Sequence, residues 1–182
     1  MLDKDRVGGA LDQPDDPLAG YRTVDQAGGQ VGGEDRPGHD GPAQFLEDQH
    51  GLGHAEAHAT VELGTAYAKE REQFGKPIGT FQAVKHILAD MLTRAEVARA
   101  AVYAAGVTLD DPSVGDPARA AHGAKLIAGE GAIANGKACI QVHGGMGFTW
   151  EVDAHLYLKR AFVLDTVFGS GDDHAEAMAA LV

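Results

Sequence analysis

Apolar residues recur with a helical period along the last two thirds of the chain. Over Phe81–Ala105 they are spaced by three and four residues, which places them on one face of a helix about seven turns long. Thr80 precedes this face and is predicted to be its N-cap. An earlier helix is predicted over Ala55–Glu72, because Gly75 and Pro77 follow it and end a helix. The apolar positions of the longer helix are Phe81, Val84, Leu88, Met91, Ala95, Ala98, Val102 and Ala105.

Capping signals mark two more long helices and a short one. The Asp116–Pro117 pair is typical of a helix start, and the helix that begins there extends to the Gly144–Gly145 pair. A fourth helix is predicted over Val152–Phe168, with Gly169 just past its end, and a short helix over 172–181. No segment alternates like a strand. The pattern therefore predicts an all-α fold, a four-helix up-and-down bundle with short connections.

The third helix carries four interior glycines, although glycine in a helix is less stable than alanine by about 1 kcal/mol. These glycines imply a gain elsewhere, and we expect neighbouring helices to approach closely at their positions. They are Gly123, Gly129, Gly131 and Gly136.

One carboxylate of the fourth helix stands among apolar residues. Asp165 is flanked by Leu164 and Val167, and a carboxylate in such surroundings needs a partner. Lys125 or Arg99 from a neighbouring helix can supply one, and the sequence does not choose between them.

The first 53 residues differ in composition from the rest. They hold 11 of the 25 glycines and four of the seven prolines, and their large apolar residues follow no helical or strand period. Such a segment buries too little apolar surface to offset the entropy of ordering. We therefore divide the chain into residues 1–52, a disordered or irregular N-terminal tail, and residues 53–182, the bundle. A helix start within residues 44–52 stays open as an alternative.

Charge and cysteine content narrow the function classes. The chain has 27 acidic and 15 basic residues, a net charge of −12, which repels phosphates and argues against nucleic-acid binding. No apolar run approaches the roughly 18 residues of a membrane span, and the first residues lack the apolar stretch of a signal peptide. The single cysteine, Cys139, excludes an internal disulfide and fits a reducing compartment, so we expect a cytoplasmic protein.

Two segments can carry chemistry. Arg71 stands at a helix C-terminus with Phe74 nearby, where a guanidinium and an aromatic ring can receive a diphosphate ligand. The alternative for Arg71 is simple compensation of the helix dipole. The Gly144–Gly145 pair lets a ligand approach the backbone closely, but a helix C-cap explains the pair equally well.

A third constellation is a row of histidines. His50, His54 and His58 are four residues apart, so on a helix they would share one face, and two such histidines can bind zinc. The segment does not match the His-Glu-x-x-His pattern of zinc proteases, and a polar helix face explains the spacing. We predict no metal site.

Taken together, the two candidate segments resemble the acyl-CoA dehydrogenase family. The similarity rests on R-x-Q-F-G over 71–75, F-Q at 81–82 and Q-x-H-G-G-x-G-F over 141–148, and it extends from about Gly53 to the C-terminus. Members of that family have an N-terminal helical domain, a central β-domain and a C-terminal four-helix bundle. The resemblance thus implies that last bundle from Gly53 onward, in agreement with the periodicity.

The resemblance also implies FAD as the cofactor, bound between two subunits. The bundle of one subunit would meet the adenosine diphosphate end of the FAD held by its neighbour. Arg71 and Gln73 would contact the diphosphate, and Phe81 and Gln82 would lie near the adenosine half. The implied cofactor-binding residues are Arg71, Gln73, Phe74, Phe81, Gln82, Gln141, Gly144 and Gly145.

The implied reaction is α,β-desaturation of an acyl-CoA thioester, in which a carboxylate removes the α-proton while the β-hydride passes to the flavin. The family's commonest base is a glutamate after the fourth helix, and Gly169 stands at that position here. Asp172 and Asp173 lie three and four residues later, and a second base position known in the family falls near Glu47. The catalytic base is therefore left unassigned.

Residues 1–52 resemble neither the β-domain nor the helical lead-in, which hold much of the flavin ring and the acyl pocket in the family. We therefore expect a flavin-dependent acyl-CoA dehydrogenase that is truncated here and inactive alone. The alternative is a non-catalytic bundle fragment or partner subunit that docks onto a complete dehydrogenase. The implied partners are an acyl-CoA substrate and an electron-transfer flavoprotein, and an uncovered bundle surface favours homo- or hetero-oligomers.

Overall fold

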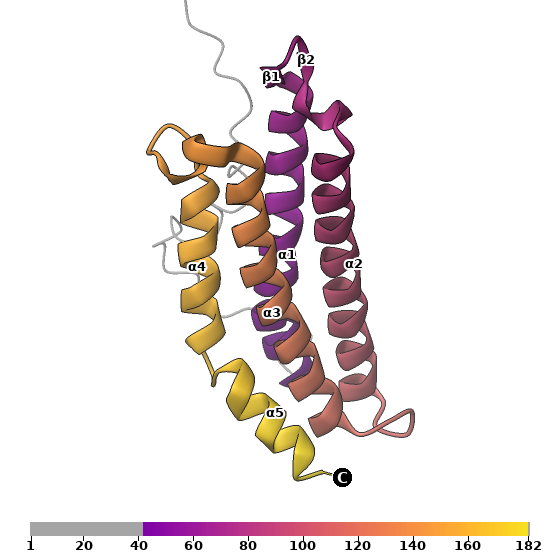
Figure 1. The fold of residues 1–182 in the computed structure, drawn as a ribbon. Coiled ribbons are helices and arrows are strands. Elements are labelled where there is room, and N and C mark those ends of the chain that lie inside the picture. Colours follow the sequence, from indigo (N-terminus) through magenta and orange to yellow (C-terminus); the bar gives the residue numbers. More distant parts are fainter. Residues whose placement is uncertain (1–41, 182) are drawn as a thin grey trace, which may run out of the picture. The chain divides into compact units, whose positions relative to one another are not determined.

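The computed structural model describes the backbone of residues 42–181 and the side chains from residue 53 to residue 181. Four long helices run alternately up and down, and a fifth, short helix continues beyond the fourth (Figure 1). This arrangement confirms the predicted all-α, four-helix up-and-down bundle. The elements are α1 (Pro42–Glu70), β1 (Glu72–Gln73), β2 (Lys76–Pro77), η2 (Ile78–Thr80), α2 (Gln82–Asp110), α3 (Pro117–His143), η3 (Gly144–Phe148), α4 (Ala154–Thr166) and α5 (Gly171–Ala179).

The core follows the predicted apolar face of α2. Its inner positions from Met91 onward are buried, whereas Val84 and Leu88, near the start of the helix, are half-buried. Helix α3 packs against α1, α2, α4 and α5, so it is the central element of the described bundle. The buried α2 residues on the predicted face are Met91, Ala95, Ala98, Val102 and Ala105.

Several helix ends differ from the predicted ones. Helix α1 begins at Pro42 rather than Ala55, so it includes the helix start left open within 44–52 and the last part, 42–52, of the tail predicted over 1–52. Residues 1–41 of that tail lie outside the described residues. Thr80 is not the N-cap of α2, because its Oγ1 donates to the Pro77 carbonyl at 2.7 Å and Phe81 occupies the cap position. The cap of α3 is confirmed, since Asp116 accepts the backbone N–H of Arg119 at 3.0 Å.

The expectation that no strand forms is wrong at one place. Glu72–Gln73 and Lys76–Pro77 pair as a two-residue antiparallel hairpin directly after α1. Its turn consists of Phe74 and Gly75, with φ angles of 56° and 76°. Two residues are too few to show the alternation by which a strand is recognised in sequence.

The glycines of α3 lie where other helices approach it, as predicted. A Cβ at Gly136 would stand 3.0 Å from the Cα of Leu158 on α4, and one at Gly129 would stand 2.8 Å from an Asp165 oxygen. At Gly131 the nearest α2 atoms would lie at an ordinary 3.7 Å or more. The absence of a side chain at Gly136 therefore sets how closely α3 and α4 pack.

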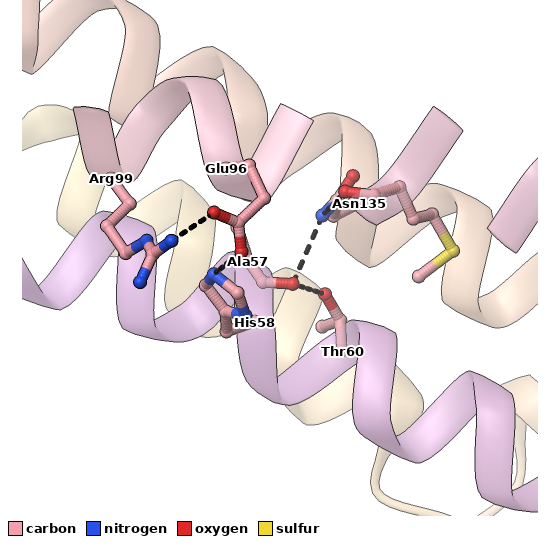
Figure 2. Close-up of polar contacts among 7 residues, drawn as sticks. Ala57, His58, Thr60, Glu96, Arg99 and Asn135 are labelled. Carbon is pink, nitrogen blue, oxygen red and sulfur yellow. Dashed lines mark hydrogen bonds and ion pairs between the residues drawn. The ribbon is translucent and has the colours of Figure 1, made fainter. Parts of the chain in front are cut away.

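A buried amide joins three helices. Asn135 of α3 is fully buried, and its Nδ2 donates to the carbonyls of Ala57 on α1, at 3.1 Å, and Met91 on α2, at 2.9 Å. Its Oδ1 accepts from Arg94 Nε at 2.8 Å. Figure 2 shows the Asn135 side chain directed at the α1 backbone, where the Ala57 carbonyl also accepts from Thr60. The amide thus fixes the axial positions of α1 and α2 against α3.

Of the two candidate partners for Asp165, Lys125 is the one that contacts this end of α4. Its Nζ donates to the carbonyls of Leu164, at 2.7 Å, and Asp165, at 3.3 Å, and so caps the C-terminus of α4. Burial lowers the pKa of Lys125 and the nearby Asp165 charge opposes that shift. Arg99, the alternative, instead pairs with Glu96 one turn earlier on α2.

None of the helices in the part of the chain that the structure describes is long and apolar enough to cross a membrane.

Candidate functional site

The C-terminal ends of α1 and α3 are held together by two stacked rings. Tyr67 on the last turn of α1 and His143 at the end of α3 have ring centroids 4.2 Å apart and planes inclined by 28°. His143 is buried, and its Nδ1 lies 2.8 Å from the Cys139 carbonyl, to which it donates. The hairpin after α1 and the turn after α3 therefore lie at the same end of the bundle (Figure 1).

An aromatic ring stands exposed at the tip of the hairpin. The side chain of Phe74 is 92% exposed. Its φ of 56° lies in the left-handed region, which non-glycine residues avoid. Phe81, at the start of α2, meets it edge to face with centroids 6.1 Å apart, and the Lys76 ammonium lies 4.6 Å from the Phe81 centroid. A strained, exposed aromatic residue contributes nothing to the core, so we interpret Phe74 as a contact residue.

Arg71 stands between α1 and the hairpin. Its backbone N–H donates to Tyr67 and its carbonyl accepts from Ile78, both at 2.8 Å, so the main chain at this position is fixed from both sides. Its side chain is exposed and forms no ion pair within the described residues. A guanidinium fixed at its base and open at its tip can bind an external phosphate or carboxylate. Gln73 and Gln82 are exposed at the same end.

The glycine pair after α3 leaves its backbone open. A Cβ at Gly144 or Gly145 would meet nothing within 4 Å, and Gly144 has a φ of 60°. Gly144 also caps α3 by donating its N–H to the Gln141 carbonyl, so the C-cap interpretation holds as well. Gly147 is different, because a Cβ there would lie 2.7 Å from the Ile140 carbonyl oxygen. Packing therefore requires glycine at 147, backbone conformation favours it at 144, and neither explains it at 145.

Two further aromatic residues lie at this end: Phe148, which closes the 141–148 motif but was given no role, and Trp150, which was not singled out from the sequence. Phe148 and Trp150 are 73% and 81% exposed in and just after η3. Lys159 lies 4.9 Å from the Trp150 centroid, and the His155 ring meets Trp150 edge to face at 4.8 Å. The available signal was their position in a glycine-rich loop of a chain that is only 6% aromatic.

Gly169, where the resemblance implies the commonest base of the family, carries no carboxylate. Gly169 has a φ of 104°, and a Cβ there would lie 3.3 Å from His174 Nε2, so a larger residue would be strained. Asp173 is engaged as a cap, because its carboxylate accepts the Ser170 N–H and hydroxyl at 2.8 Å each. Those hydrogen bonds from Ser170 lower the pKa of Asp173, which is the wrong direction for a proton acceptor. The side chain of Glu47 lies outside the described residues.

The histidine row on α1 makes contacts within the bundle. His58 Nε2 lies 3.3 Å from Glu96 of α2 (Figure 2). The rings of His54 and His58 meet edge to face with centroids 6.5 Å apart. The side chain of His50 lies outside the described residues. Among residues 53–181, three or more histidine, cysteine, aspartate or glutamate side chains nowhere gather as metal ligands would.

Glu56 is a buried carboxylate that the sequence did not reveal. It is 3% exposed, and its Oε2 lies 3.4 Å from Arg160 Nε of α4, while its Oε1 accepts no hydrogen bond from the residues that the structure describes. Burial raises the pKa of Glu56 to about 7, although the Arg160 charge opposes this. It faces the interior of the bundle and not the open end, so it is a structural group.

Glu56→Gln should remove a pH dependence of stability. The folded protein keeps the Glu56 proton up to about pH 7, whereas the unfolded carboxyl ionises near its ordinary 4.5, so stability falls as pH rises through that window. The loss amounts to at most about 3 kcal/mol. Urea unfolding followed by circular dichroism at pH 5, 6.5 and 8 measures the free energy of unfolding of both proteins. The value for the variant, relative to that of the wild type, should increase as pH rises. A constant difference between the two proteins would contradict this.

Comparison with known proteins agrees with this geometry. A sequence model of the acyl-CoA dehydrogenase C-terminal domain matches residues 51–182. The acyl-CoA dehydrogenase FadE34 of Mycobacterium tuberculosis is 48% identical over 122 residues, which are 67% of this chain and 17% of that protein. The FAD complex of PigA has a TM-score of 0.67 and 30% identity, covering 72% of this chain and 34% of that one. The electron transferring flavoprotein of Acidaminococcus fermentans has a TM-score of 0.70 and 28% identity, covering 77% and 37%.

The up-and-down helices and the two open loops at one end define a helical-bundle domain of the flavoprotein dehydrogenase type. The chain belongs to the acyl-CoA dehydrogenase family and corresponds to the C-terminal domain of that family. It spans well under half the length of each of the three similar proteins.

Proposed function

We propose that this bundle supplies the adenosine diphosphate half of an FAD site in an acyl-CoA dehydrogenase. The observation that carries the proposal is the Tyr67–His143 stack, which brings the Arg71 hairpin and the Gly144–Gly145 turn to one end of the bundle. The cofactor-binding set at that end would be Arg71, Gln73, Phe74, Phe81, Gln82, Gln141, Gly144 and Gly145.

The donor set fits a diphosphate bordered by flat rings. Arg71 offers a charged fork for phosphate oxygens, and the open backbone at Gly144 and Gly145 allows close approach of a ligand. Phe74 offers an exposed face on which an aromatic ring can pack. When bound, FAD supplies the hydride acceptor for α,β-desaturation of an acyl-CoA thioester. The described residues offer nothing equivalent for the flavin ring, so a second chain would complete the site.

Arg71→Ala should weaken FAD binding by roughly tenfold or more, because a charge-assisted hydrogen bond to phosphate contributes about 1.5–3 kcal/mol. Flavin fluorescence during titration of the full chain measures the affinity. Riboflavin, which lacks the diphosphate, should bind neither protein measurably. Arg119→Ala is the matched control, since Arg119 is exposed at the other end of α3, about 40 Å from the proposed site. Equal FAD affinity of Arg71→Ala and the wild type would overturn the assignment.

Acyl-CoA desaturation and electron delivery to an electron-transfer flavoprotein belong to the assembled enzyme in this proposal. We expect no turnover of acyl-CoA by the chain alone, because Gly169 offers no base and its φ of 104° disfavours any replacement. Detectable turnover by the purified chain with FAD and butyryl-CoA would contradict this expectation.

A second candidate is a non-catalytic subunit that docks onto a complete dehydrogenase. It is favoured by apolar side chains exposed along one helix, because such a row marks an interaction surface. Light scattering of the chain alone and mixed with a complete family member tests it, and a mixed assembly is the expected result. These exposed side chains on α4 are Leu156, Phe162 and Val163, with Val167 and Phe168 just beyond its end.

A further inference from the structure

Two histidines meet between α3 and α5. The Nδ1 atoms of His122 and His174 are 2.7 Å apart, and the ring centroids are separated by 4.9 Å. His174 Nε2 lies 3.1 Å from the carbonyl oxygen of Phe168, in the turn that joins α4 to α5. The pair therefore links the central helix, the short last helix and the turn between α4 and α5.

Which ring nitrogens carry protons follows from the atoms that can only accept a hydrogen bond. The Phe168 carbonyl only accepts, so His174 Nε2 carries a proton and donates it. A neutral His174 then has a bare Nδ1, which accepts the Nδ1–H of His122. If both rings are protonated at Nδ1, two N–H groups face each other at 2.7 Å and the hydrogen bond is lost. The contact therefore requires that at least one of the two Nδ1 atoms carries no proton, so the docked pair binds one proton fewer than two free histidines.

Helix α5 buries little of its own surface. None of its side chains is fully buried, although it packs along α3. Met178 lies against Gly123, and Gly171 lies against Leu126. An element with so little buried surface opens more readily than the core, so a single polar contact has a large share in its docking.

We propose that the His122–His174 contact is a pH-operated latch that docks α5 on α3 and fixes the Phe168–Gly169 turn. Above pH 6.5, the ordinary pKa of histidine, the latch is closed. As pH falls below 6.5, His174 binds a proton more readily when α5 is undocked than when α5 is docked. The equilibrium therefore moves toward an undocked α5.

The charges around His174 favour this direction. Burial is the largest effect that lowers the pKa of His174, and the His122 and Lys125 charges on α3 lower it further. The Phe168 carbonyl and the Asp173 carboxylate act against them but do not prevail. The Asp165 charge at the end of α4 acts on Lys125. Acidification should therefore loosen α5 rather than tighten it.

Amide hydrogen exchange of the full chain between pH 8 and pH 5 tests the latch. Protection factors over 171–179 should fall by roughly tenfold for each unit by which docking lowers the pKa of His174. Protection of the α2 and α3 core should not fall in step, because protonation of buried Glu56 stabilises the folded state over the same range. A protection of α5 that is equal at both pH values would overturn the proposal.

Two variants separate the latch from simple fraying of the chain end. In His122→Asn the amide can donate to or accept from His174, so the pH dependence of α5 protection should become weaker, and only the part caused by burial of His174 should remain. In His174→Gln the titrating group is gone, so the pH dependence should disappear. His86→Asn, which changes an exposed histidine of α2, should behave as the wild type. If α5 protection still falls with acid in His174→Gln, or falls as steeply in His122→Asn as in the wild type, the proposal is wrong.

Discussion

Asn135→Ala should lower the free energy of unfolding by about 3 kcal/mol. The substitution removes hydrogen bonds to the Ala57 and Met91 carbonyls and leaves the Arg94 guanidinium without its acceptor. A neutral hydrogen bond contributes about 1 kcal/mol and one to a charged group about 1.5–3 kcal/mol, while the higher helix propensity of alanine returns a few tenths. Urea unfolding followed by circular dichroism, with α-helical signal as the probe, measures the change.

Thr93→Ala is the matched control for Asn135→Ala. Thr93 also donates from its side chain to a backbone carbonyl, that of Ala89 at 2.9 Å, but at an exposed position within α2. Its loss should change stability by less than about 0.5 kcal/mol. A change below 1 kcal/mol in Asn135→Ala would mean that the buried amide does not hold the three helices in register.

Gly136→Val should destabilise the bundle by about 2 kcal/mol. The Cβ alone would stand 3.0 Å from Leu158 Cα and 3.2 Å from Leu158 Cβ, and valine adds two more carbons at this contact. Helix α4 must then move away from α3, and such overpacking costs about 1–3 kcal/mol, more than the few tenths gained in helix propensity. Thermal and urea unfolding of the purified variant give the difference.

Gly131→Ala provides the contrast within the same helix. A Cβ at Gly131 would find Arg94 and Ala98 atoms at 3.7 Å and 3.8 Å, which is ordinary contact. The substitution should therefore stabilise the protein by up to about 1 kcal/mol through helix propensity alone. Two substitutions in one helix should thus have opposite signs, and equal signs would show that the contact with Leu158 does not control the packing.

Periodicity predicted the fold because the bundle is built from long, regular helices. The inner positions of α2 from Met91 to Ala105 were assigned to the core from their spacing alone, and they are buried. The ends of the helices were predicted less accurately than their buried faces. Thr80 has the chemistry of an N-cap, but its hydroxyl bonds to Pro77 in the preceding turn. The Phe74–Gly75 hairpin was missed because its left-handed phenylalanine has no sequence signal.

The candidate site was predictable in part. Arg71 and the Gly144–Gly145 pair were singled out by residue type and by the family motifs, and the structure places both segments at one end of the bundle. Asn135 and Glu56 were not foreseen, because a single polar residue in a helix gives no sign of whether it faces inward. Partners 41 and 78 residues away decide the role of Asn135, and local spacing carries no information on such distances.

The central position of α3 has a consequence for how the chain folds. A helix with four interior glycines has a weak tendency to form by itself, yet α1, α2, α4 and α5 all pack on it. Neighbours must therefore be present before α3 becomes stable; α1 and α2 pack on each other, whereas α4 and α5 pack mainly on α3. We therefore expect α3, α4 and α5 to unfold in one cooperative step and not one helix at a time.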